Sequence, residues 1–230
     1  GKFDKGKGGA YSFSGGLHGV GVSVTNALST RLEATSYREG QVARLVFSAG
    51  DVIEPLTKQP KGDGDRKQGT TVRVWPDAKY FESSNLPMNE LTHLLRSKAV
   101  LMPGVSVSLV NEKTRDTQAW QYKGGLRDYL QQTLNGEPVI PLFEGEGFAD
   151  SGHESFAEGE GASWCVAFTE DGHPVRESYV NLIPTSAGGT HESGLRDGLF
   201  TAVKSFIELH SLLPKGVKLL PEDVFARASY

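Results

Sequence analysis

The sequence has one cysteine, two methionines and no long apolar run among its 230 residues. A single cysteine, Cys165, excludes an internal disulfide framework and fits a reducing compartment. Its apolar neighbours over 162–168 predict a buried structural thiol rather than a reactive one. Because no apolar run reaches membrane-spanning length and no signal peptide opens the chain, we expect a cytoplasmic protein without membrane contact.

Excess positive charge is also lacking. The formal net charge is −4, which gives no electrostatic reason for this segment as a whole to bind nucleic acid. Hydrophobic residues make up 37% of the chain and charged residues 23%, as in an ordinary globular protein that can bury a core. The length allows one large domain or two modest ones.

Glycine, in contrast, is concentrated near the N-terminus. Four glycines fall within the seven residues 15–21, and an apolar, helix-compatible run follows at once. Glycine permits positive φ and a close approach of backbone N–H groups to an anion. A helix that starts directly behind such a loop adds free N–H donors. The pattern predicts a phosphate-binding loop and a helix over 20–28, with a glycine-rich connecting turn as the alternative.

Two other phosphate-binding loops fit this stretch less well. A P-loop needs a lysine directly after its last glycine, and none follows Gly19 or Gly21. The G-x-G of a dinucleotide fingerprint is present, and Glu39 lies at a suitable distance, but Val24 occupies the third glycine position. The segments behind Glu39 alternate like antiparallel strands instead of forming a βαβ unit. An NAD-binding oxidoreductase domain is therefore an alternative that depends on Glu39.

Hydrophobic periodicity predicts further elements in the first part of the chain. A period of two over 31–75 predicts antiparallel strands, with a hairpin turn at 38–40 and a strand over 70–74. Residues 58–68 are predicted to form an exposed loop without calcium-ligand spacing. Helices are expected over 87–101 and 126–134, and strands over 105–110 and 118–122.

A boundary is predicted near Pro138, so we divide the chain into domains 1–137 and 138–230. The acidic, glycine-rich stretch 143–161 is expected to be a solvated loop, and His153 within it a structural residue. Paired strands are expected over 163–169 and 176–183.

The last elements are predicted to be helical. A helix with one apolar face should follow residues 188–191, and another should begin at Pro221. His191 is expected to be structural, because no nucleophile lies at a suitable spacing.

Several motifs occur in one order along almost the whole chain: 1–4, Tyr11, 14–29, 68–76, 179–185, 188–191 and 194–196. Together they resemble the ATP lid and glycine box of the GHKL ATPases. Within that superfamily they are similar to the B subunits of the bacterial type IIA topoisomerases, gyrase and topoisomerase IV. The stretches 91–93, 98–101 and 213–219 look closer to topoisomerase IV, and gyrase is the alternative.

This resemblance implies an α+β fold. A truncated GHKL (Bergerat) ATPase α/β sandwich would occupy residues 1–137. The start of a transducer domain, like the second domain of ribosomal protein S5, would occupy residues 138–230.

The resemblance also implies a set of nucleotide contacts. Lys2 and Tyr11 would reach toward the nucleotide, backbone N–H groups over 17–21 would bind its phosphates, and Thr70 would help to bind adenine. Arg38 would lie at the rim of the pocket. The implied cofactor-binding residues are Lys2, Tyr11, Gly16, Leu17, His18, Gly19, Val20, Gly21 and Thr70.

The implied cofactors are ATP and Mg²⁺. In the family, the catalytic Glu, an Asn that binds Mg²⁺ and an Asp that binds adenine precede the position of Gly1, and a Gln-Thr-Lys loop follows that of Tyr230. No catalytic residue or metal ligand is therefore expected in this segment. Because the sequence begins with Gly1 inside a motif, we expect a piece of a longer protein that lacks turnover by itself.

The parent protein would resemble enzymes in which ATP closes a dimeric gate and drives one DNA duplex through another. Its expected partners are DNA through the holoenzyme, a topoisomerase A-type subunit, and a second copy of the chain when ATP binds. The alternative from another class is a non-catalytic nucleotide-binding module.

Overall fold

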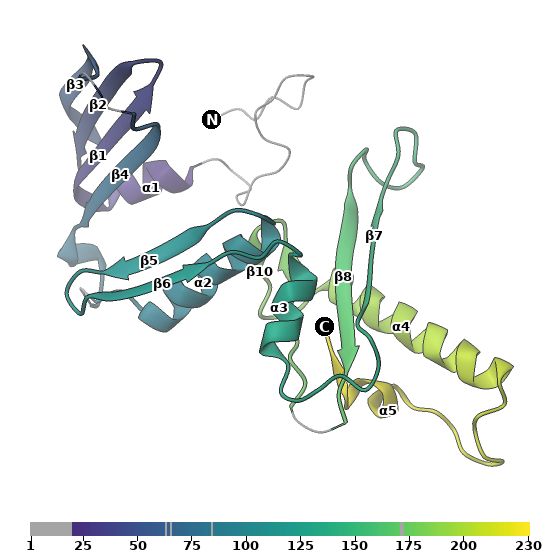
Figure 1. Ribbon diagram of the computed structural model, residues 1–230. Helices are drawn as coiled ribbons and strands as arrows, with labels where there is room; N and C mark the ends of the chain where they lie inside the picture. The colour runs from purple at the N-terminus through teal and green to yellow at the C-terminus, as the bar shows by residue number, and fades with distance from the viewer. Residues whose placement is uncertain (1–19, 63, 65, 84, 171–172) are drawn as a thin grey trace. The chain divides into compact units, whose positions relative to one another are not determined.

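A computed structural model describes residues 20–62, 64, 66–83, 85–170 and 173–230 (Figure 1). The chain divides into two compact units, Gly1–Pro87 and Met88–Tyr230. Within the described ranges, no helix combines the length and the apolar character that crossing a membrane requires.

The first unit is an antiparallel sheet with a short helix (Figure 1). Its elements are α1 (Gly21–Ala27), β1 (Ser29–Arg38), β2 (Gln41–Ser48), β3 (Asp51–Pro60), β4 (Gly69–Pro76) and the 3-10 helix η1 (Ala78–Tyr80). The strand order is β3-β2-β1-β4. Glu39 and Gly40 turn the chain between β1 and β2 with φ of 51° and 72°, as a two-residue hairpin turn requires. The predicted helix, hairpin and strand over 70–74 are thus confirmed.

Strand β3 was not predicted, and its last residues correct the expected loop over 58–68. Glu54 lies opposite Val46 and Thr57 lies opposite Arg44, so the strand bulges around Pro55. A proline is tolerated at a bulge of an edge strand, because the ladder loses no essential hydrogen bond there. Proline and the short alternation concealed this strand in the sequence.

The first half of the second unit follows the sequence-based expectation. It comprises α2 (Met88–Leu101), the hairpin of β5 (Val107–Asn111) with β6 (Asp116–Trp120), and α3 (Leu126–Thr133). Ala99, Val100, Tyr122 and Tyr129 form its buried cluster, with Val107, Trp120 and Leu126 packed against them.

A three-stranded sheet in the second unit corrects two predictions. The order is β11-β8-β7, from β7 (Phe143–Phe148), β8 (Gly161–Phe168) and β11 (Ala228–Ser229). Residues 143–148 therefore form a strand that pairs with 161–166 instead of belonging to a loop. Strand β8 also does not pair with 176–183, where β9 (Tyr179–Val180) and β10 (Ile183–Pro184) pair with each other. Alternating Glu and Gly in 143–148 concealed the strand, and short-range periodicity cannot identify a partner some sixty residues away.

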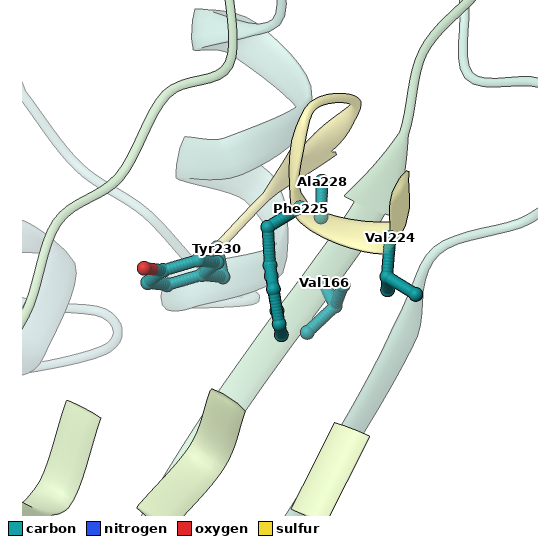
Figure 2. Packing of buried hydrophobic residues seen from close by; sticks show 5 residues of the cluster. All are labelled: Val166, Val224, Phe225, Ala228 and Tyr230. Carbon is teal, nitrogen blue, oxygen red and sulfur yellow. The ribbon is translucent and has the colours of Figure 1, made fainter. Parts of the chain in front are cut away.

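Two helices complete the second unit, α4 (Thr190–Leu209) and α5 (Pro221–Phe225), both as predicted. Figure 2 shows Val166 of β8, Val224 and Phe225 of α5, and Ala228 and Tyr230 gathered in one core. Leu195, Leu199, Phe200 and Val203 of α4 pack against this cluster. Phe206, which the apolar pattern puts on the same helix face, is 57% exposed, so the packed part of that face ends before Phe206.

Candidate functional site

The N-terminus of α1 contains the described end of the predicted phosphate loop. Val20 precedes the helix with φ −105° and ψ −2°, and its apolar side chain gives no cap hydrogen bond. The first turn also contains no acidic residue, so in the described part no carboxylate of that turn competes for its N–H groups. Unpaired backbone N–H groups can donate hydrogen bonds to an anion. Helix α1 has only seven residues, however, and is too short to define an anion site alone.

Thr70 lies near the beginning of β4, opposite Ser36 of β1. In an antiparallel pair, directly opposed residues share a face, so Thr70 lies on the same face as Val72 and Val74, opposite Ala34 and Leu32. The Thr70 side chain is exposed. This is an apolar sheet face with two hydroxyls, those of Ser36 and Thr70, near its edge.

A hydrogen bond connects the ends of α1 and β4, at the end of β4 that lies away from Thr70. Asp77 donates its backbone N–H to Leu28 O at 2.9 Å, directly behind α1 and β4. Thr70 is six residues before Pro76, about 20 Å along an extended strand. Val20, Gly21 and Thr70 therefore belong to one compact unit. Lys2, Tyr11, Gly16, Leu17, His18 and Gly19 lie outside the described residues.

The hairpin tip contains Arg38, expected at the pocket rim, and Glu39, on which the dinucleotide alternative depends. Arg38 Nε donates to Glu39 Oε1 at 2.9 Å, and both side chains are largely exposed. Glu39 lies between two antiparallel strands, not at the carboxyl end of a parallel strand in a βαβ unit. The dinucleotide-binding alternative is therefore wrong for this chain.

An ion-pair network across β1, β2 and β3 was missed by the sequence analysis. Glu33 accepts from Arg31 at 2.8 Å and lies 3.3 Å from Arg44. Glu54 lies 3.1 Å from Arg31 and 2.5 Å from Arg44. The guanidinium groups hold the pKa of both carboxyl groups below their usual value. The network ties three strands together, and opposite charges two residues apart in β1 were its only sequence signal.

The residues expected to be structural have structural partners. His191 Nε2 lies 3.1 Å from Thr185 Oγ1, and His153 Nδ1 accepts backbone N–H groups of Ser155 and Phe156. Cys165 is 6% exposed, and burial raises the pKa of its thiol to about 11. Its low thiolate content fits the predicted inert thiol. Across the described ranges, no three His, Cys, Asp or Glu side chains converge as metal ligands would.

Comparisons with known proteins place this geometry in a family. Residues 125–230 match the family model described as DNA gyrase B. The B subunit of DNA topoisomerase 4 from Escherichia coli (strain K12) is 44% identical over 224 residues, which cover 96% of this chain and 34% of that protein. The chain thus spans about a third of the length of this curated relative.

Solved structures agree with the sequence relatives. The topoisomerase IV ATP-binding domain of Francisella tularensis, solved with a small-molecule inhibitor, is 35% identical with a TM-score of 0.67. The match covers 97% of this chain and 57% of that one. The 43K ATPase domain of Thermus thermophilus gyrase B, solved with an aminocoumarin, is 25% identical with a TM-score of 0.71, covering 92% and 56%.

The antiparallel sheets, the helices and these structural matches define the class of the fold, which is that of the GHKL ATPase domains of topoisomerase IV and gyrase B. Within that class, the chain belongs to the B subunits of the bacterial type IIA topoisomerases. The resemblance inferred from the sequence motifs is confirmed.

Proposed function

We propose that this chain is part of the ATP-binding, ATP-hydrolysing and gate-closing region of a topoisomerase IV-type enzyme. The observation that carries the proposal is 44% identity to a topoisomerase IV B subunit over 96% of the chain. The higher identity to the topoisomerase IV domain than to the gyrase domain, 35% against 25%, favours this assignment over gyrase.

We infer that the nucleotide is ATP with Mg²⁺ and that its contacts are those implied by the family motifs. The phosphates would bind to backbone N–H groups of 17–21, with Lys2, Tyr11 and Gly16 beside them and Thr70 toward the adenine. The uncapped first turn of α1 fits such a ligand, since Val20 is 51% exposed and, among the described residues, no atom lies within 4 Å of a Cβ built at Gly21. The described residues provide no cluster that would hold Mg²⁺ alone, so phosphate oxygens would supply much of its coordination.

We propose that residues 1–137 are the C-terminal part of the ATPase domain and residues 138–230 the beginning of the transducer. The gyrase B family match, which starts at residue 125, supports a change of domain in this region. The proposed partners are DNA through the holoenzyme, a topoisomerase A-type subunit, and a second copy when ATP binds. We also propose a cytoplasmic location, which the single, buried cysteine Cys165 supports.

Gly21→Ala tests the phosphate site without disturbing the fold. Among the described residues, a Cβ at Gly21 would meet no atom within 4 Å, and alanine favours a helix over glycine by about 1 kcal/mol. The unfolding temperature should therefore stay the same or rise. A Cβ between the helix start and the phosphates should weaken ATP binding roughly 10- to 100-fold, as expected for a lost hydrogen bond to a charged group.

The measurement uses the full-length enzyme with its A-type subunit and compares ATP affinity, ATP turnover and decatenation. Gly198→Ala is the matched control, because Gly198 lies in α4 and its Cβ would also meet no atom within 4 Å. Equal ATP affinity in the two variants would refute the phosphate site. Affinity without turnover in the unsubstituted enzyme would favour the non-catalytic module, and ATP-driven supercoiling would favour gyrase.

A further inference from the structure

Glu177 lies at the centre of a hydrogen-bonded cluster within the second unit. Its carboxylate accepts the Tyr129 hydroxyl of α3 at 2.8 Å and the Tyr179 hydroxyl of β9 through its other oxygen. Burial and the carboxylate raise the pKa of both phenols, so both remain donors at any physiological pH. One side chain thus joins a helix and a strand about fifty residues apart.

Arg96 of α2 supports the same cluster from its other side. Its Nε donates to Tyr122 Oη at 2.7 Å, and its guanidinium lies 4.8 Å from the centre of the Tyr129 ring. Tyr122 and Tyr129 meet edge to face at 5.6 Å and are 3% and 8% exposed. The Tyr122 and Tyr129 rings and the Arg96 guanidinium therefore hold one another in place. Each of the two packed rings also has a polar partner for its hydroxyl.

The cluster continues to α4 through the end of the chain. The backbone N–H of Glu177 donates to Tyr230 O at 2.9 Å. The Tyr230 hydroxyl donates to Glu192 Oε1 at 2.7 Å and accepts from Arg196 at 3.1 Å, both of which belong to α4. A continuous set of hydrogen bonds and ring contacts thus runs from α2 and α3 to α4.

We propose that Glu177 is a positioning residue that holds α3 and α4 in one fixed arrangement and so transmits the nucleotide state from residues 1–137 to residues 138–230. The proposal rests on the proposed function. Polar networks in a partly buried setting restrict geometry more strictly than apolar packing does, because a shift leaves a polar group without its partner. Coupling between two parts of a protein requires that movement of one part moves the other. The contacts through Glu177 would transmit a movement of α3 to α4 in this way.

The test is a double substitution, Tyr129→Phe with Tyr179→Phe, in the full-length enzyme with its A-type subunit. Both rings remain, but Glu177 loses both phenol donors. ATP turnover should stay close to that of the unsubstituted enzyme, while duplexes passed per ATP should fall roughly 2- to 30-fold, the range for residues along a coupling network. Tyr80→Phe, an exposed tyrosine outside the cluster, is the control and should leave the ratio unchanged.

Two outcomes overturn the proposal. A parallel loss of turnover and passage means that the cluster only supports the fold, and an unchanged ratio means that it transmits nothing. Amide hydrogen exchange gives a readout that is independent of enzymatic function: the double variant should exchange faster in α4 as well as in α3. Acceleration confined to α3 refutes the link, whereas an inactive unsubstituted enzyme refutes only the proposed function.

Discussion

Phe225 is the phenylalanine buried in the core of the three-stranded sheet. It lies beside Tyr230 in this core (Figure 2). It is 3% exposed and meets Tyr230 edge to face at 6.5 Å. The Arg196 guanidinium lies 4.3 Å from its ring centre. Phe225→Ala should lower the free energy of unfolding by about 3–5 kcal/mol, because a large buried cavity is left. Phe206→Ala should cost less than about 1 kcal/mol, since that ring is 57% exposed. Urea titration measures both, and equal losses would show that this core is not organised around Phe225.

At the scale of elements, the charge network on β1, β2 and β3 makes the first sheet sensitive to acid. Hydrogen bonds from Arg31 and Arg44 lower the pKa of Glu33 and Glu54 below 4.5 in the folded state. Lowered carboxyl pKa values stabilise the fold fully above about pH 4.5, and this contribution is lost as the pH falls through the folded-state values. Glu54→Gln should therefore destabilise the protein at pH 7 and do so less at pH 3.

Urea unfolding at the two pH values, with and without added salt, measures that difference. Salt should reduce the effect at pH 7, because the four side chains are partly open to solvent. Glu39→Gln is the matched control, since its pair with Arg38 is largely exposed at a hairpin tip and connects no further strand. An equal pH dependence for both variants would contradict a special role of the network.

Elements whose pattern is strong and local could be predicted from the sequence, and those that depend on distant partners could not. Helices α2 and α4 and the hairpin of β1 with β2 follow directly from periodicity and turn residues. Strand β7 has no apolar alternation to reveal it, because Glu and Gly alternate between its two phenylalanines. Its strand conformation is seen only in its pairing with β8. The Glu177 cluster shares this property in part, since Tyr129 of α3 lies 48 residues before the carboxylate that it contacts.

At the scale of the whole molecule, the sequence motifs predicted the class of protein, whereas the division into compact units comes from the contacts in the structure. The predicted division at 137/138 follows prolines and an acidic stretch, and the contacts divide the chain at Pro87/Met88. The two boundaries report different properties: the predicted one follows the sequence pattern, and the observed one follows the packing of the chain. Helix α3 shows how the two divisions differ. It precedes residue 138, and so belongs to the first predicted domain, but it packs on β8 in the second compact unit.

The last prediction concerns that helix. Leu130 of α3 is buried with Leu142, Cys165 and Ala167, and Leu126 and Leu134 pack on the same cluster. Removing α3 would expose these side chains, and each fully buried leucine contributes about 1.5–3 kcal/mol. A polypeptide of residues 88–230 should therefore unfold cooperatively, whereas residues 138–230 should be several kcal/mol less stable or lack a cooperative transition. Thermal unfolding followed by circular dichroism compares the two, and adding a peptide of residues 122–137 should restore stability to the shorter one. Equal stability of both polypeptides would show that the fold of residues 138–230 does not depend on α3, and it would also remove the structural basis for a link through Glu177.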